Sequence, residues 1–181
     1  FHPSEDVRSN ANRLVKIVRA YPDDDVNKSV GRKISFGTCG PVNGQPVLIL
    51  PPLGGCRLGL CRFHDELASR NMRGISVDRP GVGQTEPFPD FVPDETHAEQ
   101  HVCDCLSIMD YLGIDRVVLF GMCAGARYVI PFLKYFPSRV YQSAAVFISP
   151  FVSPTDAPDV MGSFFKFLTC PEPFHSTCCE S

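Results

Sequence analysis

Short apolar runs alternate along the chain with longer segments in which apolar residues recur every three or four positions. The runs are bounded by turn residues, which predicts strands at residues 30–36, 46–50, 74–78, 117–120 and 144–149. The periodic segments predict helices at residues 60–70, 96–112 and 124–135. Strands that alternate with helices of this length pair in parallel. The pattern therefore predicts an α/β fold, a mostly parallel sheet with helices on both faces.

The two ends of the chain show different patterns. Apolar residues at helical spacing after an acidic start predict an amphipathic helix at residues 4–20, within an N-terminal helical arm of residues 1–30. The first two core strands, separated by a glycine and proline cluster, are expected to form a hairpin-like opening to a core domain of residues 31–160. Residues 161–181 show neither the helical nor the strand periodicity of apolar residues and are predicted to be an irregular tail.

Composition and charge narrow the class of protein. The chain has 181 residues and 44% hydrophobic content, which suits one domain, and its formal net charge is −3. No run of lysine or arginine offers a surface to nucleic acid or an anionic membrane, and no apolar stretch approaches the roughly 20 residues that cross a bilayer. A small molecule is the expected partner. The nine scattered cysteines, an odd number, indicate a reduced, cytoplasmic protein.

One five-residue segment carries the candidate chemistry. Gly121-Met122-Cys123-Ala124-Gly125 follows an apolar strand and opens a helix. Its two glycines permit a tight turn that projects the cysteine side chain. This arrangement is the geometry of a nucleophile elbow.

The elbow and three other segments make the chain resemble the α/β-hydrolase superfamily over about residues 34–150. The other matching segments are the glycine-bearing loop 51–55, the turn 78–85 and the pair Arg139-Val140. Within the superfamily the chain is most similar to uncharacterised fungal members. It has Cys123 where serine is usual.

The resemblance implies a hydrolase that acts on an ester, a thioester or a lactone, with Cys123 as nucleophile. It also implies an oxyanion hole built from the backbone N–H groups of Ala124 and Leu53. Pro51 and Pro52 stand where many relatives have His-Gly, and because proline has no N–H, the second donor is expected at Leu53 or beyond. The helix after the elbow favours the thiolate, and dienelactone hydrolase, a member of the superfamily, is similar in using cysteine.

The resemblance also implies an acid and a histidine after the nucleophile, in that order. His175 is the histidine that follows Cys123, and Asp156 is the candidate acid, with Asp159 and Glu172 as alternatives. The stretch after the last predicted strand has about the length of one βαβ unit, ~30 residues, whereas relatives place two more strands before their histidine. The sequence therefore predicts a C-terminally truncated fold with an exposed final edge strand. The alternative function is a non-catalytic domain that binds a small ligand or a partner.

Histidines and cysteines elsewhere raise the question of a metal. His97, His101 and Cys105 are spaced i, i+4 and i+8, which places them on one face of the predicted helix. The order His-Ala-Glu-Gln-His differs from that of a zinc-protease helix. In the superfamily that the chain resembles, the corresponding helix packs on the sheet, which implies that Cys105 lies in the core, with His97 and His101 exposed near the helix start. No metal and no cofactor is predicted.

The turn after the strand at 74–78 has two polar residues of interest. Asp78 is expected to brace the turn, and Arg79 to meet a carboxylate or solvent. Gly81-Val82-Gly83 lacks the third glycine of a dinucleotide-binding loop and predicts a turn.

Overall fold

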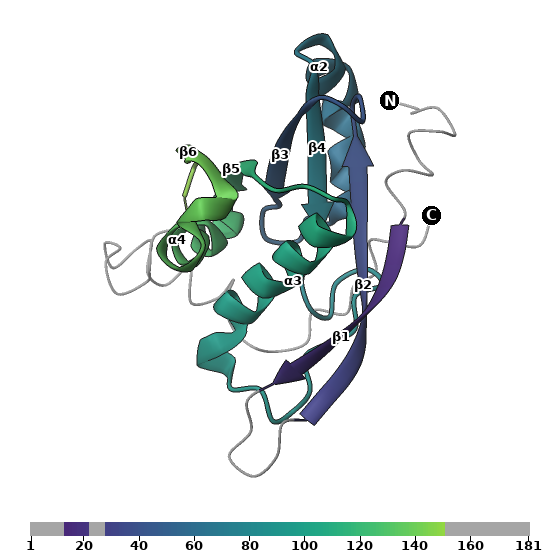
Figure 1. The fold of residues 1–181 in the computed structure, drawn as a ribbon, viewed down its shortest axis with the longest axis vertical. Helices are drawn as coiled ribbons and strands as arrows, with labels where there is room; N and C mark the ends of the chain where they lie inside the picture. Colours follow the sequence, from purple (N-terminus) through teal and green to yellow (C-terminus); the bar gives the residue numbers. More distant parts are fainter. Residues whose placement is uncertain (1–12, 22–27, 151–181) are drawn as a thin grey trace. The chain divides into compact units, whose positions relative to one another are not determined.

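The computed structural model describes residues 13–21 and 28–150, and a mixed β-sheet runs through them (Figure 1). Its six strands are β1 (Arg13–Tyr21), β2 (Lys28–Cys39), β3 (Gln45–Leu50), β4 (Met72–Val77), β5 (Val117–Met122) and β6 (Val140–Ile148). Their order across the sheet is β1-β2-β4-β3-β5-β6. The pairs β1·β2 and β2·β4 are antiparallel, and the three remaining pairs are parallel. The predicted mostly parallel sheet is therefore present, with an antiparallel margin.

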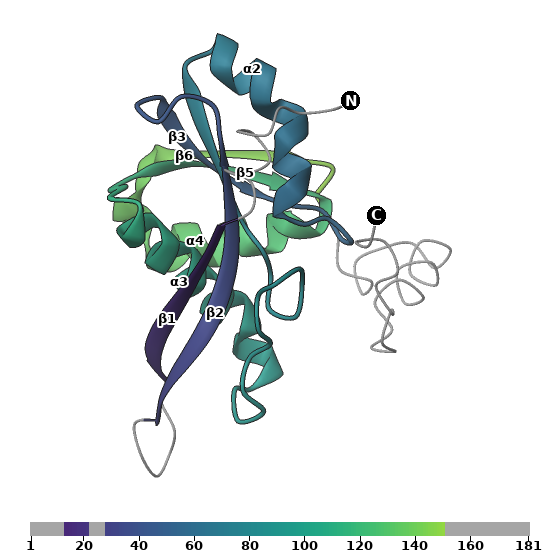
Figure 2. The same cartoon turned by 90° about the vertical axis from the view of Figure 1, so that its right-hand side faces the viewer.

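Helices cover both faces of the sheet (Figure 2). The α-helices are α2 (His64–Ser69), α3 (His97–Tyr111) and α4 (Ala126–Tyr135), and the short 3-10 turns are η1 (Arg57–Phe63), η2 (Asp94–Thr96), η3 (Cys123–Gly125) and η4 (Pro137–Arg139). Buried side chains of α3 and α4 pack against one face of the strands, and those of η1 and α2 pack against the other. The predicted fold class is confirmed.

Strand β5 shows how the sequence pattern produces these layers. Val117 and Leu119 are fully buried in the cluster shared with α3 and α4. Val118, Phe120 and Met122 pack against the cluster under η1 and α2 and stay partly exposed. Successive side chains of a strand alternate between faces. A run without polar residues is therefore typical of a strand whose two faces are both covered.

The predicted N-terminal helix is wrong over the residues that the structure describes. Arg13–Tyr21 forms β1, which pairs antiparallel with β2. The spacing of the apolar residues in this segment fits a helix as well as a strand. Its valines and isoleucine favour a strand once a neighbouring strand supplies hydrogen bonds. Residues 1–12 and the predicted tail at 161–181 lie outside the described residues.

The predicted hairpin between the first two core strands is also wrong. Strand β2 lies between β1 and β4, whereas β3 lies between β4 and β5. Residues 47–50 of β3 are all buried. A strand this apolar belongs in the centre of a sheet, where two neighbours and two helical layers cover it. On the side away from β4, β2 pairs antiparallel with β1.

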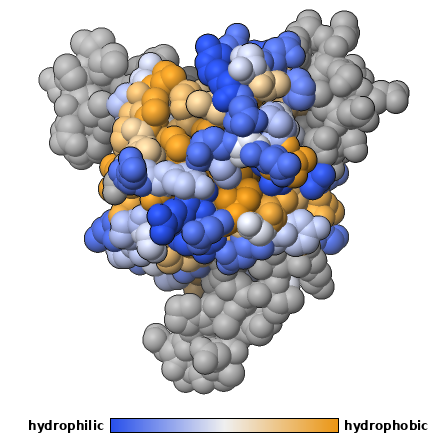
Figure 3. All heavy atoms as spheres, turned by 45° about the horizontal axis from the view of Figure 1, so that its top comes forward, coloured by the Kyte–Doolittle hydropathy of each residue, from blue (hydrophilic) through white to orange (hydrophobic). Residues whose placement is uncertain are grey.

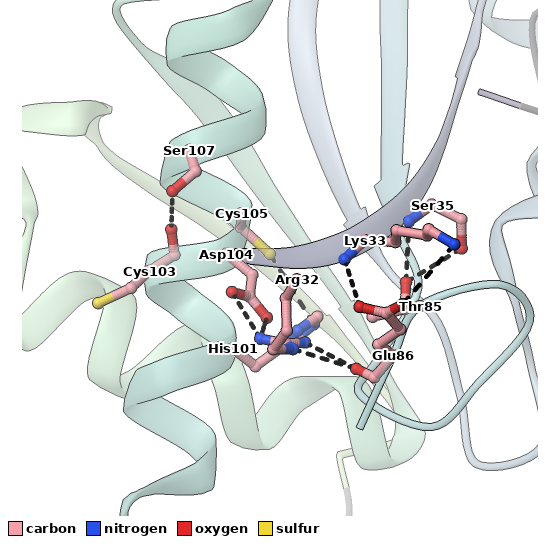
Figure 4. A network of polar contacts seen from close by, with 10 residues as sticks. All are labelled: Arg32, Lys33, Ser35, Thr85, Glu86, His101, Cys103, Asp104, Cys105 and Ser107. Atoms are coloured by element: carbon pink, nitrogen blue, oxygen red, sulfur yellow. Dashed lines mark hydrogen bonds and ion pairs between the residues drawn. The ribbon is translucent and has the colours of Figure 1, made fainter. Parts of the chain in front are cut away.

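A buried ion pair fastens α3 to β2 (Figure 4). Nη1 of Arg32 donates to both carboxylate oxygens of Asp104, at 3.2 and 3.1 Å, and Nε and Nη2 donate to the backbone oxygen of Glu86. The guanidinium also lies over the Phe88 ring, 4.4 Å from its centroid. Charges removed from water need such a set of partners. The network fixes both α3 and the loop after β4 to the sheet.

The margin of the sheet at β6 is exposed. Tyr141, Val146, Phe147 and Ile148 are between 37% and 47% exposed. Figure 3 shows, on the face that it draws, hydrophobic surface that lies between hydrophilic residues. Among the described strands β6 is the last of the sheet, and the predicted exposed final edge strand stays a prediction, because residues 151–181 lie outside the described part.

Cys39, the last residue of β2, is a buried thiol with an altered pKa. It lies in one apolar cluster with Cys61, and its Sγ is 3.5 Å from Nδ1 of His64. Burial, together with the Cys61 thiol, raises the pKa of Cys39 from 9.0 to about 11. The folded state therefore holds this proton more tightly than the unfolded state does.

This shift predicts a loss of stability at high pH. Its contribution is fully present below pH 9.0 and is lost as the pH rises to about 11, because the unfolded chain releases the proton first. We expect the free energy of unfolding, measured by urea titration across this window, to fall more steeply in the native chain than in Cys39→Ala. Equal slopes would count against the shift.

Candidate active site

Cys123 lies at a sharp turn between β5 and α4. Strand β5 ends at Met122, η3 begins at Cys123, and α4 begins at Ala126. Cys123 has a φ of 48°, in the left-handed region that residues with a side chain rarely occupy. The thiol is free and the residue is partly exposed. Backbone strain of this kind clusters at functional sites, and the turn has the form of the predicted elbow.

The glycines on either side of the elbow allow two close approaches. A Cβ at Gly121 would lie 2.7 Å from Cγ2 of Val129 and 2.9 Å from Cα of Ala126, the start of α4. A Cβ at Gly125 would overlap the backbone oxygen of Leu50 and lie 2.7 Å from that of Pro51. The elbow is therefore packed directly against the end of β3 and the loop that follows it.

That loop contains an exposed tight turn. The N–H of Gly55 donates to the oxygen of Pro52 at 2.9 Å, and Gly54 has a φ of 76°, as the third residue of a type II turn requires. Leu53, the second residue of the turn, is 49% exposed. Among the described residues, its N–H donates no hydrogen bond. The structure thus offers an amide donor where the resemblance implied one.

Ala124 follows Cys123 in the first turn of η3. The first N–H groups of a helix have no acceptor within the helix, and the helix dipole makes them good partners for negative charge. The contact of Gly125 with Leu50 and Pro51 brings this turn against the loop that carries Leu53. The role of the two amides as an oxyanion hole stays a prediction.

The predicted acid and base cannot be joined to this site, because Asp156 and His175 lie outside the described residues. No histidine among residues 28–150 hydrogen-bonds to the Cys123 thiol: the ring nitrogens of His64, His97 and His101 meet Cys39, Val92 and Cys105. The site therefore consists, in the described part, of a nucleophile position and two amide-bearing segments.

The predicted exposure of His101 is wrong. His101 is fully buried, with Sγ of Cys105 at 3.8 Å and the Tyr128 ring at a centroid distance of 4.7 Å. Tyr128 belongs to α4, which packs over the start of α3 and covers this face. His97 stays partly exposed, and Cys105 is in the core, as predicted. The described residues contain no group of three or more metal-ligating side chains that could hold an ion.

A buried polar network beside the loop was not predicted from the sequence. Asp78 is fully buried and accepts hydrogen bonds from the backbone N–H of Arg57 at 2.6 Å, from Nη1 of Arg57 and from Oγ of Ser35 at 2.7 Å. Thr85 joins the network through the N–H of Ser35 at 2.9 Å. Asp78 does brace its turn, as expected, but it also anchors the end of the loop at Arg57. A carboxylate directly after a buried strand was the available signal.

An apolar groove of about 220 Å³ lies on the other side of the sheet from α3 and α4. Its lining includes Val47, Ile49, Phe63, Leu67 and Phe120. None of its lining residues belongs to the elbow or to the loop after β3. No helix within the described residues has the length and apolar character needed to cross a membrane.

Solved structures share this architecture. The chain is similar to Est816, described as an N-acyl homoserine lactone degrading enzyme, with 22% identity and a TM-score of 0.58 over 75% of this chain and 49% of that protein. It is also similar to a thermophilic esterase from Thermogutta terrifontis, with 19% identity and a TM-score of 0.58 over 82% of this chain and 50% of the esterase. With its mostly parallel sheet and the elbow at Cys123, the chain has the α/β-hydrolase fold.

One curated protein is similar to the chain in sequence. Zearalenone hydrolase from Bionectria ochroleuca is 27% identical over 99 residues, which are 52% of this chain and 36% of that enzyme. No protein-family profile matches the chain. The chain spans about half the length of the solved structures and about a third of the curated relative that it matches.

Proposed function

We propose that the chain is a hydrolase whose Cys123 attacks the carbonyl carbon of an ester, a thioester or a lactone. The observation that carries this proposal is the elbow: a partly exposed thiol at a strained turn, packed against a loop with an available amide. Attack by sulfur places negative charge on the carbonyl oxygen. The N–H groups of Leu53 and Ala124 would donate to that oxygen and stabilise it.

The proposed reaction has two steps. In the first, the bond from Sγ to the acyl carbon forms and the bond to the leaving group breaks, while the thiol proton passes through the base to the leaving group. In the second, water attacks the thioester, which releases the acid and restores the thiol. His175 is the proposed base and Asp156 its proposed partner, from their order in the sequence alone.

The names of the relatives support a small carbonyl substrate. One solved neighbour is described as a lactone degrading enzyme and another as an esterase. Both substrate types present an electrophilic carbonyl with an oxygen leaving group. We therefore place esters and lactones ahead of other electrophiles.

Substitution of Cys123 tests the proposal. Hydrolysis of a short-chain aryl ester, an aryl thioester and a lactone by the full chain is compared with hydrolysis by Cys123→Ala and by Cys103→Ala, which removes another partly exposed thiol. We expect Cys123→Ala to fall to the uncatalysed rate because the nucleophile is absent, and Cys103→Ala to retain the native rate. Mass spectrometry of the quenched native reaction should locate the acyl group on Cys123.

The opposite result has a definite meaning. Equal rates for Cys123→Ala and the native chain would exclude Cys123 as nucleophile. The non-catalytic domain that binds a small ligand or a partner would then be the better account of the elbow, whose position does not depend on activity.

A further inference from the structure

Arg79, two residues after the end of β4, holds the turn that carries Leu53. Its Nη2 donates to the backbone oxygens of Pro52 and Gly55, both at 3.2 Å, so one guanidinium joins the two ends of the turn. Within residues 28–150 Arg79 forms no ion pair, and its buried Nε has no hydrogen-bond partner. Its positive charge is therefore directed at the carbonyl groups of the loop.

The Pro52 carbonyl accepts hydrogen bonds from both Arg79 and the N–H of Gly55, and these two contacts together fix the direction of the Leu53 N–H. The described chain contains no cis peptide bonds, so the carbonyl of Pro52 and the N–H of Leu53 point in opposite directions across one planar amide. The carbonyl points toward Arg79, and the N–H therefore points away from it. Strand β3 lies between β4 and β5 in the sheet, and Gly125 of the elbow packs against Leu50 and Pro51, so the loop that carries this amide lies beside the turn at Cys123.

The same contact affects the strength of the donor. A cation at the carbonyl oxygen polarises the amide, because hydrogen bonds in a chain strengthen one another, and a polarised N–H is a better donor to an oxyanion. We propose that Arg79 is a positioning residue that orients and polarises the Leu53 amide toward the substrate oxyanion at Cys123. This role rests on the proposed function, since it concerns the same oxyanion.

Three variants isolate the effect in the full chain. Arg79→Met removes the charge while keeping much of the side-chain length, and Arg79→Lys keeps the charge with fewer donors. Arg70→Met is the control, because within the described ranges Arg70 pairs only with exposed groups of α2, among them the carboxylate of Glu66. Circular dichroism and thermal unfolding establish that each variant folds.

The first readout needs no activity. In two-dimensional ¹H–¹⁵N spectra we expect the Leu53 amide proton to move upfield in Arg79→Met. Exchange of the Gly55 amide, which is hydrogen-bonded to Pro52, should accelerate about tenfold as the turn loosens. Arg79→Lys should give an intermediate shift, and Arg70→Met none. An unchanged Leu53 signal in a folded Arg79→Met chain would overturn the proposal.

The second readout is the ester hydrolysis of the Cys123 experiment. We expect kcat of Arg79→Met to fall about tenfold or more, with KM nearly unchanged, because an oxyanion donor acts mainly in the transition state. Arg79→Lys should recover part of the loss. A rise in KM alone would overturn the positioning role. If the native chain shows no hydrolysis that depends on Cys123, the proposed function fails, and the amide spectra still decide whether Arg79 orients the turn.

Discussion

Replacement of Asp78 by alanine is expected to lower the free energy of unfolding by about 3–5 kcal/mol, the usual cost of removing one partner of a buried ion pair. Asp78 is 0% exposed and Arg57 is 4% exposed. Alanine removes the carboxylate and leaves the guanidinium of Arg57 and the hydroxyl of Ser35 without this acceptor. Urea denaturation of the native and variant chains at neutral pH measures the difference.

Two further variants show whether the charge or the packing is responsible. Asp78→Asn keeps the shape and one acceptor oxygen, so we expect a smaller loss than for alanine. Glu66→Ala removes the carboxylate of an exposed pair with Arg70, whose side chains are 70% and 59% exposed, and should cost less than about 1 kcal/mol. If Asp78→Ala cost no more than Glu66→Ala, the buried pair would not matter for stability.

Gly125→Ala is expected to destabilise the chain by about 1–3 kcal/mol or more, the usual result of forcing an extra carbon into a packed site. The backbone gives no reason for this loss, because φ at Gly125 is −63° and alanine is the better helix former. The loss comes from the added Cβ, which would overlap the oxygen of Leu50 and lie 2.7 Å from that of Pro51. Backbone atoms cannot rotate away, so the elbow must separate from β3.

Gly59→Ala is the matched control for this substitution. A Cβ at Gly59 would meet no atom within 4 Å, and its φ is not positive. We expect the melting temperature of Gly59→Ala to stay at or slightly above the native value, while that of Gly125→Ala falls by several degrees. Equal melting temperatures for the two variants would show that the elbow does not press on β3 as the structure indicates.

The parts of the fold that the sequence predicted correctly depend on local pattern. The strand, turn and helix around Cys123 are contiguous, and their glycines and apolar run predict the elbow without any distant contact. The segment Arg13–Tyr21 is different, because its apolar residues suit a helix or a strand and its pairing with β2 decides between them. Tertiary hydrogen bonding outweighed helical spacing there.

The polar networks depend on pairs that no local pattern indicates. Arg32 and Asp104 are 72 positions apart, and Arg57 and Asp78 are 21 apart. Each side chain alone resembles an ordinary surface residue in the sequence, since arginine and aspartate are usually exposed. The contact of Arg79 with the loop involves backbone oxygens, which every residue possesses. Such contacts become visible only when the strand order is known.

The strand order also sets the sequence in which this sheet can be completed during synthesis. The β1–β2 ribbon can pair early. Strand β3 comes next in the chain, but its two neighbours in the sheet, β4 and β5, are both made after it. A growing chain that stops short of Met122 therefore leaves β3, whose residues 47–50 are buried in the complete sheet, with an open edge, and open apolar edges promote the aggregation of nascent chains. The turn that carries Cys123 is made only after β5, so the site takes shape once five of the six described strands exist and before β6 joins the sheet.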